Sequence, residues 1–157
     1  MKDFVYGLKK GIPIGISYLA VSFAFGVFAA TGLSPLLAVI MSFSNLTSSG
    51  QFAGTKLIIQ DASYIEIAIT VLLINLRYSL MSISISQKLD DNFPTWKRLI
   101  VGFGITDETY AIAITEKKKL TFGYLLGLMS LPLFGWTLGT AIGAFGSNFL
   151  GDRLLES

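Results

Sequence analysis

Apolar residues run almost without interruption through the first third of the chain. Residues 11–55 contain no Asp, Glu, Lys or Arg, whereas about 20 apolar residues are enough to cross a bilayer once. A run of this length cannot form a single span, so it is predicted to fold back on itself. Residues 31–35, which include Gly32 and Pro35, interrupt the apolar pattern and predict the turn of a helical hairpin.

The hydrophobic pattern of the whole chain predicts helical segments at residues 12–30, 36–59, 65–86, 99–115 and 120–147. The fourth segment contains Gly102, Gly104 and the acidic pair Asp107 and Glu108, so whether it crosses the membrane is left open. We expect an all-α fold, a polytopic membrane helix bundle of about five spans, formed by residues 1–157 as a single transmembrane domain.

Glycines recur every fourth residue in the first and last predicted segments. Small residues at this spacing lie on one helix face and allow a neighbouring helix to approach closely. We therefore expect these faces to be packing surfaces between helices. The residues concerned are Gly7, Gly11 and Gly15, just before and within the first segment, and Gly123, Gly127, Gly135, Gly139 and Gly143 in the last.

The second predicted segment carries small polar residues between Ser42 and Gln51. Ser, Asn and Gly are poor residues for a helix interior, because side-chain oxygens compete for the backbone and Gly adds chain entropy. In lipid, an opened turn is tolerated only where it is buried or lines a wet cavity. Two structures fit: a broken or re-entrant helix whose freed backbone groups bind a substrate, and an intact helix whose polar residues bond to neighbouring helices.

The third and fourth segments place ionisable residues at membrane depth. A charge inside a span is costly, so Arg77 is expected to be paired or functional. Glu66 precedes Arg77 by eleven residues, about 16 Å along a helix, and cannot pair with it directly. Asp107 and Glu108 are the candidate partners, in a structural ion pair or in a pathway. The alternative for these acids is a plain helix start, with Thr106 as the N-cap.

Composition places the chain among membrane proteins and excludes several classes of enzyme. Of its 157 residues 14% are charged, with a mean hydropathy of +0.65, whereas soluble domains carry about 25% charged residues. The absence of His and Cys excludes His-dependent nucleophiles and Cys/His metal sites, and there is no ATP-binding P-loop. We expect no enzyme, metal or cofactor, and any proton relay would use Glu66, Asp107 or Glu108.

The basic residues are scattered and do not alternate with aromatic residues, so no nucleic-acid partner is expected. If all five segments cross, seven lysines share the side of the N-terminus and four basic residues lie on the other side. The positive-inside rule then predicts a cytoplasmic N-terminus. The first group is Lys2, Lys9, Lys10, Lys56, Lys117, Lys118 and Lys119, and the second is Lys88, Lys97, Arg98 and Arg153.

Short motifs are spread over most of the chain. The more specific ones are Asn75, Leu76, Arg77, Tyr78 and, later, Thr106, Asp107, Glu108. Less specific are Gly11, Ile12, Pro13, Gly15, Phe23, Phe25, Gly26 and Gly32, together with Gly50, Gln51, Phe52, Ala53, Gly54, and with Leu80 and Met81. In this order the motifs resemble the AzlC family of branched-chain amino-acid permeases.

The resemblance implies export of leucine, isoleucine and valine, with methionine as a further candidate, across a bacterial inner membrane by secondary transport. It also implies a small membrane partner subunit of the AzlD type. Family members are expected to continue for one or two more spans, so this chain, which ends in the polar residues 152–157, is expected to be truncated. The alternative function is a non-transporting scaffold or partner subunit that needs another protein to form a pathway.

The polar residues at membrane depth suggest how a zwitterionic amino acid would bind. They would hold its backbone, while apolar neighbours such as Phe52 and Leu76 would accept the branched side chain. Such pockets discriminate a methylene by only about 1–3 kcal/mol, so broad specificity is expected. The candidate substrate-binding residues are Asn45, Ser48, Ser49, Gly50, Gln51, Asn75 and Arg77, and the candidates for coupling or an ion pair are Glu66, Asp107 and Glu108.

Overall fold

The computed structural model describes the backbone of residues 1–155 and the side chains of residues 1–147 and 149. The polar end predicted at residues 152–157 lies outside the described side chains. Within the described part the chain forms seven helices and no strand. They are α1 (Lys2–Ala29), α2 (Pro35–Ser44), α3 (Ser48–Ile59), α4 (Tyr64–Ser86), α5 (Thr95–Phe103), α6 (Asp107–Thr115) and α7 (Phe122–Leu155).

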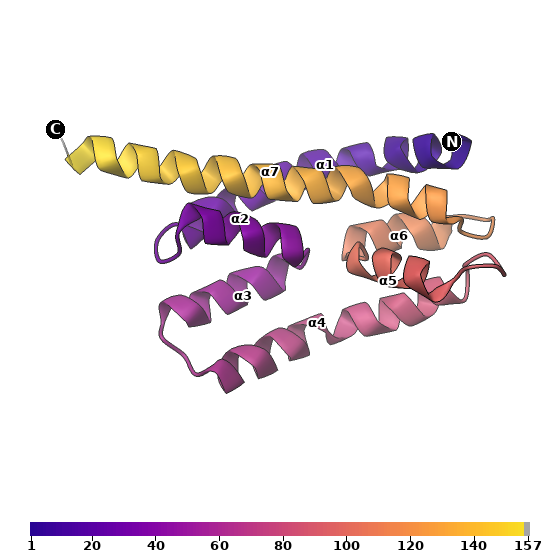
Figure 1. The fold of residues 1–157 in the computed structure, drawn as a ribbon, viewed down its shortest axis with the longest axis horizontal. Coiled ribbons are helices and arrows are strands. Elements are labelled where there is room, and N and C mark those ends of the chain that lie inside the picture. Colours follow the sequence, from indigo (N-terminus) through magenta and orange to yellow (C-terminus); the bar gives the residue numbers. More distant parts are fainter. Residues whose placement is uncertain (156–157) are drawn as a thin grey trace.

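Three of these helices, α1, α4 and α7, are long and apolar enough to cross a membrane. Helices α1 and α7 lie side by side and run in the same direction (Figure 1). Helix α4 lies on the other side of the bundle, with the four short helices between it and the α1–α7 pair (Figure 1). The predicted all-α membrane bundle is confirmed.

The glycine faces bring α1 and α7 into backbone contact. A Cβ atom added at Gly7 would lie 2.1 Å from the Tyr124 carbonyl oxygen, and one added at Gly127 would lie 2.2 Å from the Phe4 carbonyl oxygen. No side chain fits in such a gap, so glycine is required for the two helices to pack at this distance. The predicted role of the glycine faces in packing is confirmed.

Helices α2 and α3 are the two arms of a re-entrant hairpin. Residues 45–47 separate them, and Asn45 and Thr47 have extended backbone angles. A Cβ atom added at Gly32, just before α2, would lie 2.6 Å from Cγ1 of Ile59 at the end of α3. The hairpin therefore enters and leaves at the same end of the bundle. Of the two structures that fitted the sequence here, the broken helix is the one observed.

Helices α5 and α6 form a second hairpin that enters from the opposite end (Figure 1). The Lys88 ammonium, just after α4, donates to the carbonyl oxygens of Ile114 and Glu116, each at 2.6 Å. This contact places the end of α6 beside the end of α4. Residues 104–106 separate the two arms, and Thr106 caps α6, as predicted from the sequence.

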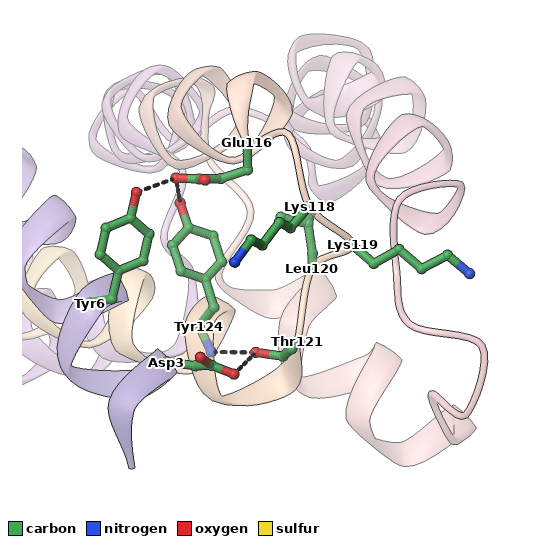
Figure 2. A pocket seen from close by; sticks show the side chains of 8 residues that line it. All are labelled: Asp3, Tyr6, Glu116, Lys118, Lys119, Leu120, Thr121 and Tyr124. Atoms are coloured by element: carbon green, nitrogen blue, oxygen red, sulfur yellow. Dashed lines mark hydrogen bonds between the residues drawn. The ribbon is translucent and has the colours of Figure 1, made fainter.

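The end of α6 also lies beside the start of α1 and the start of α7. The Glu116 carboxylate accepts from the hydroxyls of Tyr6, at 3.1 Å, and Tyr124, at 3.2 Å (Figure 2). The Thr121 hydroxyl donates to Asp3 at 3.0 Å (Figure 2). One end of the bundle, called the N-terminal face below, therefore gathers the start of α1, the ends of α4 and α6, and the start of α7.

The number of membrane crossings therefore differs from the five that the sequence predicted. Three long helices span the length of the bundle, and the segments predicted at residues 36–59 and 99–115 each fold back to the face from which they entered (Figure 1). The count of basic residues that assumed five alternating crossings was wrong, because Lys56 and the group Lys117, Lys118 and Lys119 lie at opposite ends of the bundle.

Candidate functional site

The two helix breaks meet near the middle of the bundle. Leu46 of the first break and Gly104 of the second line the same pocket, and the hairpins approach one another from opposite ends (Figure 1). The helix that follows each break, α3 or α6, starts at this level. Helix starts carry unpaired N–H groups and the positive end of the helix dipole. The centre of the bundle therefore combines open backbone with polar side chains.

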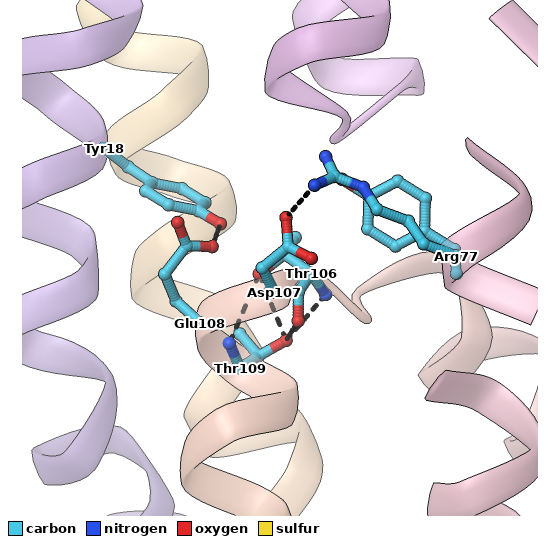
Figure 3. A network of polar contacts seen from close by, with 7 residues as sticks. Tyr18, Arg77, Thr106, Asp107, Glu108 and Thr109 are labelled. Carbon is cyan, nitrogen blue, oxygen red and sulfur yellow. Dashed lines mark hydrogen bonds and ion pairs between the residues drawn. The ribbon is translucent and has the colours of Figure 1, made fainter. Parts of the chain in front are cut away.

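An ion pair joins α4 to α6 at this level. The Arg77 guanidinium lies 2.7 Å from the Asp107 carboxylate (Figure 3). Arg77 also donates to the Tyr78 hydroxyl at 3.3 Å and lies over the Tyr78 ring, 5.0 Å from its centroid. The two charged side chains are 39% and 40% exposed, so the pair remains accessible from outside the described chain.

The neighbouring acid, Glu108, is bonded on the other side of α6. Its carboxylate accepts a short hydrogen bond from the Tyr18 hydroxyl of α1 (Figure 3). Asp107 and Glu108 thus connect the start of α6 to two different long helices. Thr106 and Thr109 complete this helix start with a capping box, in which each side chain bonds to the backbone N–H of the other.

Three buried polar atoms in the described side chains have no hydrogen-bond partner: the Thr47 hydroxyl, the Asn75 amide oxygen and Nε of Arg77. The first two lie together, because a Cβ atom added at Gly50 would be 2.4 Å from the Thr47 hydroxyl and 2.9 Å from the Asn75 amide oxygen. An unpaired buried polar atom costs about 1–3 kcal/mol, and such atoms are rare in native structures. Their presence beside the first break favours a site that a polar ligand completes.

The start of α3 has no side-chain cap, whereas the start of α6 is capped by Thr106. Thr47 occupies the N-cap position of α3 but makes no side-chain cap. Ser48 and Ser49 are the first two residues of the helix and Gly50 is buried beside Asn75. An uncapped helix start can bind an anionic group through its N–H groups.

Comparison with known proteins identifies the family of the chain. The family described as AzlC protein matches residues 13–150, which is most of the sequence. The chain belongs to the AzlC family. The resemblance seen in the motifs is thus confirmed, and the family match and the apolar helices together establish a membrane protein.

The relatives of this AzlC-family chain are longer than it is. The inner membrane protein YgaZ of Escherichia coli is 31% identical over 94% of the chain and 62% of its own length. An uncharacterized membrane protein of Archaeoglobus fulgidus is 36% identical over 96% of the chain and 66% of its own length. The branched-chain amino acid transport protein AzlC of Bacillus subtilis is 28% identical over 87% of the chain and 55% of its own length. No solved structure matches the AzlC-family chain significantly.

Gln51 does not offer its amide to the open site. Its oxygen accepts from the Trp136 indole at 2.6 Å, and its nitrogen donates to the Ser42 hydroxyl at 3.1 Å. The Ser42 hydroxyl also lies 2.7 Å from the Thr140 hydroxyl. Gln51 is 1% exposed and links α2, α3 and α7. Both ends of its amide are thus already used within the AzlC-family chain.

Glu66 lies apart from the polar centre formed by Arg77, Asp107, Glu108 and the unpartnered atoms of Thr47 and Asn75, whereas Asn45 lies in the first break. Glu66 is exposed in the first turn of α4, and its backbone N–H bonds to the Ser63 hydroxyl at 3.2 Å. Since Arg77 is in the middle of the same helix, the structure does not bring Glu66 to the ion pair. Asn45 ends α2 in extended backbone and its N–H bonds to the Met41 carbonyl oxygen at 2.9 Å.

Tyr18 and Trp136 belong to the centre but are missing from the residues singled out by sequence. Their rings pack edge to face, with centroids 5.3 Å apart, and each polar atom bonds to a predicted polar residue. A sequence signal existed, since an indole N–H or phenol hydroxyl buried at membrane depth needs an acceptor. For that reason, the aromatic residues inside α1 and α7 could have been predicted to hydrogen-bond with the polar residues.

Proposed function

We propose that this chain forms the substrate site of a secondary transporter that exports branched-chain amino acids across the bacterial inner membrane. The observation that carries the proposal is the set of unpartnered buried polar atoms of Thr47, Asn75 and Arg77 beside an uncapped helix start. Family membership and the name of the Bacillus subtilis relative support an amino-acid substrate. Leucine, isoleucine and valine are the proposed substrates, with methionine as a further one.

A zwitterion matches the charges of the centre. In the proposed complex the substrate carboxylate binds Arg77 and the N–H groups at the start of α3, where Ser48 and Ser49 lie. The substrate ammonium binds the carboxylates at the start of α6. Inserting the zwitterion between Arg77 and Asp107 replaces one ion pair, 2.7 Å long in the free chain, by two. Charge is thus balanced at membrane depth both before and after binding.

Because both hairpins are re-entrant, the basic residues are counted anew to infer which face of the bundle is cytoplasmic. Nine basic residues belong to helices or loops that start or end at the N-terminal face, against Lys56 near the end of α3 and Arg153 near the end of α7. The positive-inside rule therefore supports a cytoplasmic N-terminal face. The nine residues are Lys2, Lys9, Lys10, Lys88, Lys97, Arg98, Lys117, Lys118 and Lys119.

A second membrane subunit of the AzlD type is proposed to cover α4. None of the apolar window of α4 is buried within the described chain, and Leu73 and Leu80 are 62% and 71% exposed. Lipid could cover these leucines, but Arg77 lies on the same helix and is more than a third exposed. A charge facing hydrocarbon costs several kcal/mol, and a covering protein surface removes that cost.

Leucine export from liposomes tests the proposal. The chain is reconstituted with and without a candidate partner subunit, and release of labelled leucine is measured for wild type, Arg77→Gln and a control, Arg98→Gln. Arg98 donates to the Phe93 carbonyl oxygen near the N-terminal face, away from the centre. We expect Arg77→Gln to reduce release at least about tenfold, since one lost charge-assisted contact is worth about 1.5–3 kcal/mol, and Arg98→Gln to retain it.

Unchanged release by Arg77→Gln would remove Arg77 from the site. Absence of leucine release under both conditions, from correctly folded wild type, would favour the non-transporting scaffold instead. The extensive glycine-mediated packing of α1 against α7 is the feature that such a scaffold would use.

A further inference from the structure

We infer that the branched side chain of the substrate enters an apolar pocket between the two helix breaks. The pocket has a volume of about 90 Å³ and includes Leu46, Val101, Gly104, Met129 and Leu133 in its walls. The inference rests on the proposed function, because it assigns the second half of the ligand whose charged groups bind at the helix starts. It replaces Phe52 and Leu76 as the apolar residues facing the substrate.

The pocket is lined by residues of both helix breaks, next in the chain to polar residues of the centre. Leu46 directly precedes Thr47, whose hydroxyl is buried and unpartnered. The Gly104 carbonyl oxygen accepts from the Thr109 hydroxyl at 3.1 Å, which fixes the second break against the first turn of α6. An amino acid has a single carbon between its charged groups and its side chain. In the proposed complex, a ligand held at the starts of α3 and α6 places its side chain in this pocket.

The size of the pocket favours an aliphatic group of three or four carbons. An apolar protein cavity of about 150 Å³ holds benzene, whereas this pocket measures about 90 Å³. A propyl or butyl branch fills this volume, and an aromatic ring exceeds it. The one hydroxyl among the lining residues, that of Ser130, is already bonded to the Leu126 carbonyl oxygen at 2.6 Å. The pocket thus offers no free polar group to a polar side chain.

Met129 explains how one pocket accepts several branched shapes. A Cβ atom added at Gly104 would lie 2.5 Å from Sδ of Met129, so this flexible side chain packs directly on the second break. Methionine adapts to irregular neighbours more readily than branched residues do. Phe52, in contrast, packs against Phe25 and Phe28, with centroids 5.2 and 5.7 Å away, and Leu76 is 50% exposed.

Equilibrium binding to the purified full chain in lipid nanodiscs tests the inference, with alanine, valine, leucine and phenylalanine as probes. Each buried methylene strengthens binding about fourfold, and leucine has three more side-chain carbons than alanine, so leucine should bind about 60-fold more tightly. Leu46→Phe fills the pocket and should bring leucine to the affinity of alanine. Val101→Ala enlarges it and should improve phenylalanine relative to leucine at least about fourfold. Ile85→Val, in the same core but outside the pocket walls, should keep the wild-type order.

The outcomes separate the inference from the proposed function. If no amino acid binds to folded wild type, the proposed function fails and the inference fails with it. If leucine binds but alanine binds equally well, or if Leu46→Phe and Val101→Ala leave the order unchanged, the pocket holds something other than the substrate, such as a lipid chain. In that case the polar centre keeps its proposed role and the inference is overturned. Size-exclusion chromatography of each variant confirms folding before binding is measured.

Discussion

Replacing Gln51 by methionine tests whether this residue links helices or binds the substrate. Gln51→Met keeps the volume and unbranched shape of the side chain but removes its amide. The Ser42 hydroxyl retains Thr140 as a partner at 2.7 Å. The Trp136 indole N–H, whose acceptor is the Gln51 oxygen at 2.6 Å, is left unpaired in a fully buried position.

The unpaired indole sets the expected loss of stability. A buried donor without a partner costs about 1–3 kcal/mol, while hydrogen bonds between membrane helices average about 0.6 and reach about 1.7 kcal/mol. We therefore expect Gln51→Met to lower the free energy of unfolding by about 1–2 kcal/mol. For a chain of this length, a loss of this size lowers Tm by about 3–6 °C.

Thermal unfolding in detergent, followed by circular dichroism, measures this change. Trp136→Phe and the double variant complete a mutant cycle, since Trp136→Phe removes the donor that Gln51→Met leaves unpaired. The double variant should be about 1 kcal/mol more stable than the sum of the single changes predicts. Additive losses would show that Gln51 and Trp136 are not coupled and would contradict the assignment of Gln51 to helix packing. Weakened leucine binding by Gln51→Met with unchanged Tm would show instead that Gln51 acts through the ligand.

Three further changes address packing, capping and charge. Gly127→Ala should lower the free energy of unfolding by about 1–3 kcal/mol, because its Cβ atom would meet the Phe4 carbonyl oxygen at 2.2 Å. The control Gly102→Ala has no atom within 4 Å of the added Cβ and should be neutral or slightly stabilising. Equal effects of the two changes on Tm would contradict the close packing. Thr106→Val removes the cap of α6 and should cost about 0.5–2 kcal/mol in chemical unfolding, while preserved stability would mean that Asp107 and Glu108 hold the helix start without it. Asp107→Asn should weaken leucine binding more than Glu108→Gln, because Asp107 alone of the two contacts Arg77; the reverse order in a binding titration would exchange their roles.

The sequence predicted the helical elements better than their path through the membrane. Residues 36–59 carry enough apolar residues to cross once, and an apolar stretch of this length fits a crossing helix and a re-entrant hairpin equally well. The deciding contact is between Gly32 and Ile59, which belong to opposite ends of the segment. Hydropathy along the chain does not reveal that contact. The side of the membrane on which each loop lies, and with it the first count of basic residues, could therefore not be derived from the sequence.

The same limit applies to the candidate site. Arg77 needed a partner at membrane depth, and few acids were available, so Asp107 and Glu108 could be named in advance as the candidates. The start of α6 could also be predicted, because Thr106 and two acids are a local capping signal. Gln51 was different: its polarity showed that it needed bonds, but its partner Trp136 lies 85 residues later in the chain. Distinguishing a residue that binds a ligand from one that binds another helix required the tertiary structure.

The adjacent acids of α6 have a mechanical consequence. Asp107 is tied to α4 and Glu108 to α1, and these attachments point to opposite sides of the short helix (Figure 3). A sideways shift of α6 towards α1 lengthens the contact with Arg77, and a shift towards α4 lengthens the contact with Tyr18. The position of α6 therefore depends on the relative strength of the two contacts. Weakening the contact with α4 displaces α6 towards α1, and weakening the contact with α1 displaces it towards α4.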